Sequence, residues 1–351
     1  MRTKGISARL PTFDRSNAQR NRVSIKYTQH FCSVERLPAR LAPPVNNIDS
    51  LRDADQAGLT EQRPGVEMKN LFRQGLKRIT ATERRARGPR EAKVISVASL
   101  KGGVGKTTTS VNLASALARF HQQRVLLIDL DPQGHVGTSL RTQVQAGGGK
   151  LSQVLVGEEP GDVMDVATDT SVPSLRVTPS DPSLNEAENL LSTKIGKELI
   201  LRDALEITRT YYDVIVIDCP PNLGNLTLNA LVASDYLLVP CDLSPLALRG
   251  VDSLLGHAQQ VGARLNPGLD LLGVVITRHD TRTPSMNESV LTTLQSSYGE
   301  SLMPTRIGIS TSLSRAQHEG TEIFEHDAKS RGAVHYRELA AEVARRLGVI
   351  N

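Results

Sequence analysis

The glycine-rich run KGGVGKTTTS at residues 101–110 restricts the chain to a narrow set of folds. It directly follows the apolar run KVISVAS at 93–99, and it opens into a segment whose apolar residues recur at helical spacing. A strand, a glycine loop and a helix in this order form a cradle in which backbone N–H groups and the helix N-terminus face phosphate oxygens. The run therefore predicts a nucleoside triphosphate site within an α/β fold.

The residue types in this run match the tasks of a phosphate cradle. Glycines let successive N–H groups turn inward, Lys106 reaches the β- and γ-phosphates, and the Thr107 hydroxyl can ligate Mg²⁺. We predict that the triphosphate is bound by Lys101, Gly102, Gly103, Val104, Gly105, Lys106, Thr107 and Thr108.

Further apolar runs alternate with segments long enough to be crossover helices. Buried parallel strands are continuous apolar runs, because helices cover both faces of their sheet. The alternation predicts an α/β fold with a doubly wound, mainly parallel sheet of the P-loop NTPase type and helices on both faces, within residues 91–351. The later runs lie at 124–129, 174–180, 213–221, 235–242 and 269–277.

Residues 1–90 differ from the rest of the chain in charge. They hold 19 Lys and Arg against 8 Asp and Glu, whereas residues 91–351 hold 23 against 29. Prolines interrupt the first part, and we predict a basic, mostly disordered N-terminal extension with one helix at 66–87. Such an extension fits either a polyanion partner or a disordered leader. Met68 offers an alternative translation start that would omit residues 1–67.

The composition excludes several classes of protein. No run approaches the roughly 18 apolar residues of a membrane span, and the N-terminus lacks an apolar signal-peptide stretch, so we expect a cytoplasmic protein. Cys32, Cys219 and Cys241 show no CxxC spacing, which disfavours a disulfide framework, a zinc site and an iron–sulfur cluster. Aromatic residues make up 3% of the chain and Trp is absent, which leaves little for base-stacking platforms.

Acidic residues end two of the predicted strands. Asp129 and Asp131 share one side of an extended segment in LLIDLDPQGH, near the carboxyl edge of the sheet, where nucleotides bind. Asp218 ends the apolar run VIVID, from which a carboxylate can hold Mg²⁺ directly or through water. We therefore predict Asp218 as a magnesium ligand, because an unpaired charge would be costly at a buried position.

The loop departs from the standard phosphate-loop pattern. Leu100 stands where that pattern has glycine, and Lys101 adds an early lysine. KGGVGKTT with this lysine resembles the deviant Walker A box of the ParA/MinD family of ATPases. The resemblance covers roughly residues 93–348, and it includes the segments 220–255, 275–283 and 328–343.

This resemblance implies roles for particular residues. Lys101 would cross a dimer interface and touch the phosphates bound by the partner subunit, in the manner of an arginine finger. Asp131 would position or activate the attacking water, and Asp129 would support the magnesium site. The implied catalytic residues are Lys101, Lys106 and Asp131, and the implied metal residues are Thr107, Asp218 and Asp129.

The resemblance also implies a function, ATP-dependent DNA partitioning, with ATP as substrate and Mg²⁺ as cofactor. ATP would drive formation of a sandwich homodimer that binds nonspecific double-stranded DNA, and a ParB-like adaptor protein would stimulate hydrolysis to ADP and phosphate. The protein would then be cytoplasmic and nucleoid-associated. Thr277 to Asp280 would lie beside the adenine base. Arg282 aligns with an arginine that ParA proteins use on DNA. Arg306, Arg315, Lys329 and Arg331 are further candidate DNA contacts by their charge, with Arg337, Arg345 and Arg346 as weaker candidates.

One stretch departs from the family, and one alternative function stays open. Residues 305–320 read TRIGISTSLSRAQHEG in place of the proline–arginine–asparagine turn of chromosomal members, so base and DNA contacts there are not carried over with the resemblance.

The alternative function is that of a MinD-like positioning ATPase on a membrane or protein platform, which needs an amphipathic terminal helix. The basic helix at 66–87 keeps it open, but a membrane partner is disfavoured. The terminal helix shows a core-facing stripe of Val334, Leu339, Ala340, Val343 and Leu347.

Overall fold

The computed structural model describes residues 91–158, 161–179, 181–280 and 284–350 of the chain. The predicted basic extension of residues 1–90, with its helix at 66–87, lies outside the described residues, and so does Arg282.

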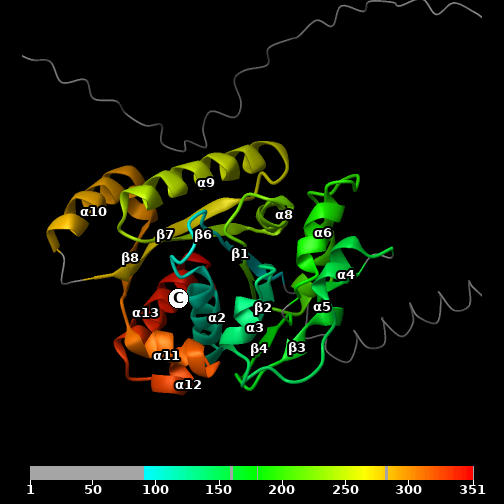
Figure 1. The fold of residues 1–351 in the computed structure, drawn as a ribbon, viewed down its shortest axis with the longest axis horizontal. Coiled ribbons are helices and arrows are strands. Elements are labelled where there is room, and N and C mark those ends of the chain that lie inside the picture. Colours follow the sequence, from blue (N-terminus) through cyan, green and yellow to red (C-terminus); the bar gives the residue numbers. More distant parts are fainter. Residues whose placement is uncertain (1–90, 159–160, 180, 281–283, 351) are drawn as a thin grey trace, which may run out of the picture. The chain divides into compact units, whose positions relative to one another are not determined.

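An eight-stranded sheet forms the centre of the described part, in the order β3-β4-β2-β5-β1-β6-β7-β8. All neighbouring strands pair in parallel except β3 and β4, which pair antiparallel. The predicted doubly wound, mainly parallel fold is therefore confirmed (Figure 1). The strands are β1 Lys93–Val97, β2 Val125–Asp129, β3 Thr168–Asp169, β4 Leu175–Val177, β5 Val214–Asp218, β6 Tyr236–Cys241, β7 Asp270–His279 and β8 Leu302–Gly308.

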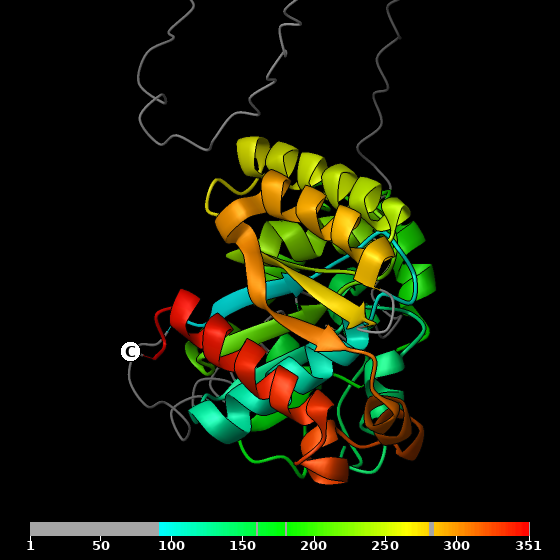
Figure 2. The ribbon, with the colours of Figure 1, turned by 90° about the vertical axis from the view of Figure 1, so that its left-hand side faces the viewer.

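Helices cover both faces of this sheet. Figure 2 shows α9 and α10 on one side of the strands and α13 on the other, beside α2. Helices α4 to α8 pack on the α9 side, and α3, α11 and α12 pack on the α2 side. The helices are α2 Lys106–His121, α3 His135–Ser139, α4 Leu151–Val156, α5 Val163–Val166, α6 Leu184–Leu191, α7 Ile200–Ala204, α8 Asn225–Ala233, α9 Pro245–Arg264, α10 Pro284–Tyr298, α11 Thr311–Glu319, α12 Ile323–Asp327 and α13 Arg331–Arg346.

Successive side chains along a strand point to opposite faces of the sheet and pack into the two cores between the sheet and its helices. In β1, Val94 packs with the α8 and α9 layer, whereas Ile95 packs with the α2 and α13 layer. In β5, Ile215 and Val216 divide in the same way. Because the central strands are buried on both faces, they are mostly apolar, apart from Ser96 and the charged residues at strand ends, and this explains why the apolar runs located six of the eight strands.

Strands β3 and β8 were missed for a physical reason. β3 has only the two residues Thr168 and Asp169. β8 lies at the other edge of the sheet, carries Pro304 and Arg306, and buries only some of its side chains. Proline and charged side chains are tolerated on an edge strand because one side of its backbone needs no ladder partner, and they remove the apolar signal.

The terminal helix α13 buries most of the predicted stripe. Leu339, Ala340, Val343 and Leu347 are buried, but Val334 is 41% exposed, so its assignment to the core was wrong. Val334 directly follows the buried Gly332 and Ala333 in the first turn of α13, so it lies on the helix face turned away from the core. Among the described residues, no helix has both the length and the apolar character needed to cross a membrane.

Candidate nucleotide site

A cavity of about 470 Å³ opens at the carboxyl ends of the central strands. Its floor is the glycine loop between β1 and α2, and its walls come from β7, β8, α11 and α13. In open α/β sheets, ligands bind in the crevice beyond the carboxyl ends of the strands. The cavity therefore lies where the glycine loop predicts a nucleotide.

Left-handed glycines shape the floor of the cavity. Gly103 has φ +74° and Gly105 has φ +86°, a backbone conformation that L side chains rarely adopt. Gly105 precedes α2 and provides no side-chain cap, and the first turn of α2 holds no acidic residue. The N–H groups at the start of α2 and the positive end of its dipole thus face the cavity, which favours an anionic ligand.

Lys106 and Asp218 lie together at the start of α2. The Lys106 side chain lines the cavity while the residue is only 7% exposed, and burial lowers the pKa of its amine against the charges of Asp218 and Asp131. The fully buried Asp218 carboxylate accepts hydrogen bonds from Thr107 Oγ1 at 2.7 Å and from Ser110 Oγ at 2.8 Å. Burial raises the pKa of Asp218 to about 6, although both hydroxyls oppose the shift.

Asp129, Asp131 and Asp218 lie at or just after the ends of β2 and β5, close enough for their charges to interact. Asp129 stands opposite Asp218 in the parallel register of these strands. Burial raises the pKa of Asp129 to about 8, and the charges of Asp218 and Asp131 act in the same direction. Asp131 is 5% exposed, lines the cavity, and accepts a hydrogen bond from the Gln133 backbone N–H at 3.0 Å. The repulsion between these acidic groups, which helps to raise the pKa of Asp129, would be relieved by a cation beside Lys106.

The oxygen atoms at this point suit magnesium. Mg²⁺ in phosphate-transfer sites is held by one or two protein oxygens together with phosphates and water. The Thr107 hydroxyl and the Asp218 carboxylate provide such a pair at the end of the phosphate loop. Asp218 contacts Thr107 directly, whereas Asp129 is coupled to this pair through the charge of Asp218, so Thr107 and Asp218 would hold the metal and Asp129 would support them. The described residues contain no cluster of three or more His, Cys, Asp and Glu that could hold a metal ion.

The Lys101 side chain points away from the other predicted site residues, although its carbonyl accepts a hydrogen bond from Lys106 Nζ at 3.5 Å. Lys101 Nζ forms an ion pair with the Asp242 carboxylate and donates a hydrogen bond to Ser244 Oγ at 3.0 Å. Both partners follow β6, on the opposite side of β1 from the carboxylates. The structure therefore brings Lys106, Thr107, Asp129, Asp131 and Asp218 together, but it turns the Lys101 ammonium toward the β6–α9 connection.

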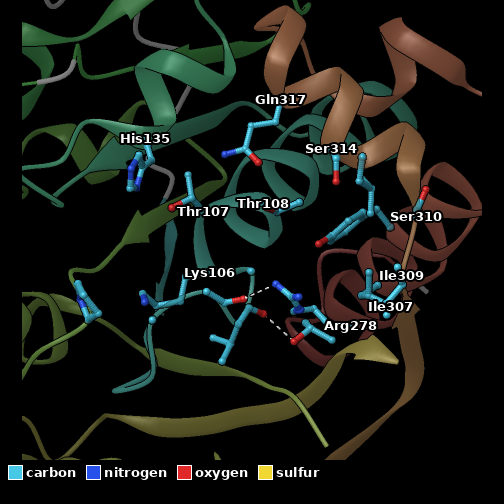
Figure 3. A pocket seen from close by; sticks show the side chains of 18 of the residues that line it. Lys106, Thr107, Thr108, His135, Arg278, Ile307, Ile309, Ser310, Ser314 and Gln317 are labelled. Atoms are coloured by element: carbon cyan, nitrogen blue, oxygen red, sulfur yellow. Dashed lines mark hydrogen bonds between the residues drawn. The ribbon is translucent and has the colours of Figure 1, made fainter. Parts of the chain in front are cut away.

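The end of β7 holds the glycine loop from the side. Thr277 Oγ1 donates to the Val104 carbonyl at 2.7 Å, and Arg278 Nη1 donates to the Gly103 carbonyl at 3.1 Å (Figure 3). Arg278 adopts φ +52°, an uncommon conformation for a residue other than glycine that is concentrated at functional sites. Of residues 277–280, which were expected beside the base, Thr277 and Arg278 line the cavity and His279 and Asp280 do not; the Thr277 hydroxyl is bound to the loop.

The far wall of the cavity comes from residues that sequence reasoning missed. Figure 3 shows Ile307 and Ile309 on one side and Ser310, Ser314 and Gln317 of the α11 segment above them. These side chains combine apolar surface with hydroxyl and amide groups, as a base-binding chamber requires. No sequence signal marked them, because residues 305–320 depart from the family pattern. Ser110, Asp242 and Ser244 were also missed, since each is recognised only by its contacts.

The predicted DNA-contact residues divide into two groups. Arg315 on α11, together with Lys329 and Arg331 before and at the start of α13, is exposed and forms no ion pair with another described residue. Arg306 on β8 is half-buried. The weaker candidates have structural partners, which are Phe120 for Arg337, with 4.5 Å between guanidinium carbon and ring centroid, and Glu342 for Arg345 and Arg346.

Comparisons with known proteins agree with this geometry. The family model of the AAA domain matches residues 92–271. The chromosome partitioning protein ParA of Caulobacter vibrioides is 40% identical over 259 residues, which cover 72% of this chain and 94% of that protein. The sporulation initiation inhibitor protein Soj of Bacillus subtilis is 40% identical over 252 residues, covering 72% and 98%. The crystal structure of cobyrinic acid a,c-diamide synthase from Mycobacterium smegmatis with bound ADP and magnesium has 34% identity and a TM-score of 0.61, covering 73% and 96%.

Proposed function

Because the chain belongs to the ParA family of partitioning ATPases, we propose that it segregates DNA as an ATP-driven sandwich dimer. The observation that carries this proposal is the divergence of two lysines on one loop. Lys106 lines the cavity of its own subunit, whereas the Lys101 side chain points out of it toward Asp242 and Ser244 in the connection between β6 and α9. Because the Lys101 ammonium lies outside the cavity of its own subunit, it can contact the phosphates bound by a partner subunit.

Within one subunit, each proposed role rests on a position at the loop. Lys106 and the loop N–H groups bind the β- and γ-phosphates, and Thr107 and Asp218 hold Mg²⁺ with support from Asp129. The metal would neutralise phosphate charge when bound. Asp131 orients the attacking water and accepts its proton, because its carboxylate lines the cavity while the Gln133 N–H fixes its orientation.

Dimer formation couples the nucleotide to DNA binding. Gly102 and Gly103 are exposed, and Leu246 at the start of α9 is 71% exposed on the segment that also contains Ser244. A twofold dimer formed through the glycine loop and the start of α9 would place each Lys101 against the phosphates of the partner's ATP. ATP would favour the closed pair because its γ-phosphate gives each Lys101 a partner that ADP lacks.

The exposed cations of the α11 and α13 region supply the proposed DNA surface. Arg315, Lys329 and Arg331 attract phosphates without reading sequence, with Arg306 and Arg282 as further contacts. Pairing two subunits doubles this charge on one assembly. A ParB-like adaptor then stimulates hydrolysis and releases the dimer from the nucleoid.

Retention of duplex DNA on a filter tests the DNA-binding part of the proposal. We expect stronger binding with ATP than with ADP, and a weakening of roughly tenfold or more in the Arg315→Ala, Lys329→Ala, Arg331→Ala triple variant. The plot of log affinity against log salt concentration should become shallower by about 0.9 for each phosphate that the variant no longer neutralises. Arg345→Ala serves as the control, because Arg345 is exposed but pairs with Glu342. Equal retention with ADP and ATP, or retention that salt does not weaken, would contradict the proposal.

A further inference from the structure

An ion pair between two strand ends restrains Lys101 in the single subunit. Lys101 follows β1 and Asp242 follows β6, and these strands are neighbours in the sheet. Lys101 Nζ contacts Asp242 Oδ2 and lies 3.0 Å from Ser244 Oγ, while Ser244 Oγ donates to Asp242 Oδ1 at 2.7 Å. The parallel register of the sheet thus places an anion within reach of this loop lysine.

We propose that Asp242 is a positioning residue that holds Lys101 in the separate subunit and must release it before two subunits pair. The inference rests on the proposed function, in which Lys101 contacts the partner's nucleotide. One ammonium cannot lie against Asp242 and against phosphates across an interface at the same time. Asp242 and the partner's triphosphate therefore compete for the same cation, and Asp242 sets how much nucleotide-driven attraction dimer formation requires.

The burial of the pair indicates the size of this competition. The Lys101 side chain is 34% exposed and the Asp242 side chain 19%, so water still screens the attraction. Ion pairs that are still partly exposed change an equilibrium by roughly threefold. A twofold dimer must release Lys101 in both subunits, so the two effects multiply to roughly tenfold in the dimer dissociation constant. A restraint of this size can be overcome by a γ-phosphate, which suits a switch.

A purely structural role for Asp242 predicts the opposite change in the dimer dissociation constant. Ser244 caps α9 by accepting a hydrogen bond from the Ala247 N–H at 3.3 Å, and Asp242 orients that hydroxyl. If Asp242 only supported the Ser244 cap, its loss would destabilise the start of α9 and weaken the dimer. If it restrains Lys101, its loss strengthens the dimer. Asp242→Asn separates the two, because the amide oxygen can still accept from Ser244 but carries no charge.

The experiment uses the full chain with two readouts. Sedimentation at saturating Mg²⁺ and AMP-PNP gives the dimer dissociation constant for wild type, Asp242→Asn and the control Asp203→Asn. Asp203 forms an exposed ion pair with the adjacent Arg202 on α7, so its variant matches the change in charge away from the loop. Amine acylation of the nucleotide-free protein, followed by mass spectrometry, reports how freely Lys101 is exposed.

We expect Asp242→Asn to raise acylation of Lys101 and to lower the dimer dissociation constant roughly tenfold relative to Asp203→Asn. An unchanged or higher dissociation constant, beside a wild type that dimerises normally, would overturn this inference alone. If wild type and both variants remain monomeric with the analogue bound, the proposed function fails and the inference fails with it.

Discussion

The carboxyl groups of Asp129, Asp131 and Asp218 lie at the ends of neighbouring strands, and they differ in surroundings. Asp218 accepts two hydroxyl hydrogen bonds, Asp131 accepts one from a backbone N–H in a turn, and the buried Asp129 feels the charges of both. Such differences separate the pKa values of chemically identical groups. The carboxyl group with a pKa of about 8 is Asp129, and that with a pKa of about 6 is Asp218.

Asp129 predicts a pH dependence of stability in the nucleotide-free protein. Its pKa is about 8 in the folded state against an ordinary value of 3.8, so the folded state binds more protons between these limits. Stability therefore falls as pH rises from about 4 to about 8, because ionising the buried group costs free energy. Thermal unfolding across this range should show a steeper decline in Tm for wild type than for Asp129→Asn. Parallel declines would contradict the assignment.

The structural and the catalytic roles of Asp131 can be separated by substitution. Asp131→Asn keeps an oxygen that accepts the Gln133 N–H but cannot take a proton from water. We expect the Asp131→Asn variant to fold and bind ATP normally, while its kcat for ATP hydrolysis falls roughly 100-fold. Steady-state phosphate release measures this. An Asn variant as active as wild type, beside an unstable Asp131→Ala variant, would reduce Asp131 to a turn residue.

At the scale of elements, two contacts fix the walls of the cavity. The end of β7 holds the glycine loop through Thr277 and Arg278, and α13 sets the position of α11. At Gly332 in the first turn of α13, an added Cβ would lie 2.8 Å from Leu313 Cγ on α11. This close approach positions the segment that carries Ser314 and Gln317.

Gly332→Ala should displace α11. We expect the free energy of unfolding to fall by about 1–3 kcal/mol, because the overlap forces side chains or backbone to move. Nucleotide affinity should fall as well, since α11 lines the cavity. Gly256→Ala on α9 is the matched control: no heavy atom lies within 4 Å of its added Cβ, so the variant should gain about 0.4–1 kcal/mol. Urea unfolding and nucleotide titration of both variants measure these effects, and a Gly332→Ala variant equal to the control would contradict the packing argument.

The sequence predicted these elements where local chemistry determines them. Strands buried on both faces are mostly apolar, so β1, β5 and β6 were evident, and the glycine loop carries its own backbone requirements. β8 escaped prediction because an edge strand tolerates Pro304 and Arg306. The ion pair of Lys101 and Asp242 joins residues 141 positions apart. Such a contact depends on the register of β1 and β6, which no local pattern encodes.

At the scale of the molecule, one lysine of the glycine loop, Lys106, lines the cavity of the single subunit, whereas the other, Lys101, pairs with Asp242 outside it. Within the described part of the chain, exposed cations that form no ion pair lie near α11 and α13, and the glycine loop opens beside the exposed Leu246. A twofold pair would join two cradles and two cationic surfaces in one event. Nucleotide state, association and DNA affinity would thereby change together.

The mass of the full chain in solution with Mg²⁺ and AMP-PNP tests this coupling most directly. The subunit mass is 38.1 kDa. We predict twice that mass for wild type with the analogue, the subunit mass with ADP, and the subunit mass for Lys101→Ala even when the analogue is bound. A wild type that remains at 38.1 kDa with bound analogue, or a Lys101→Ala variant that dimerises as wild type does, would contradict the role given to Lys101.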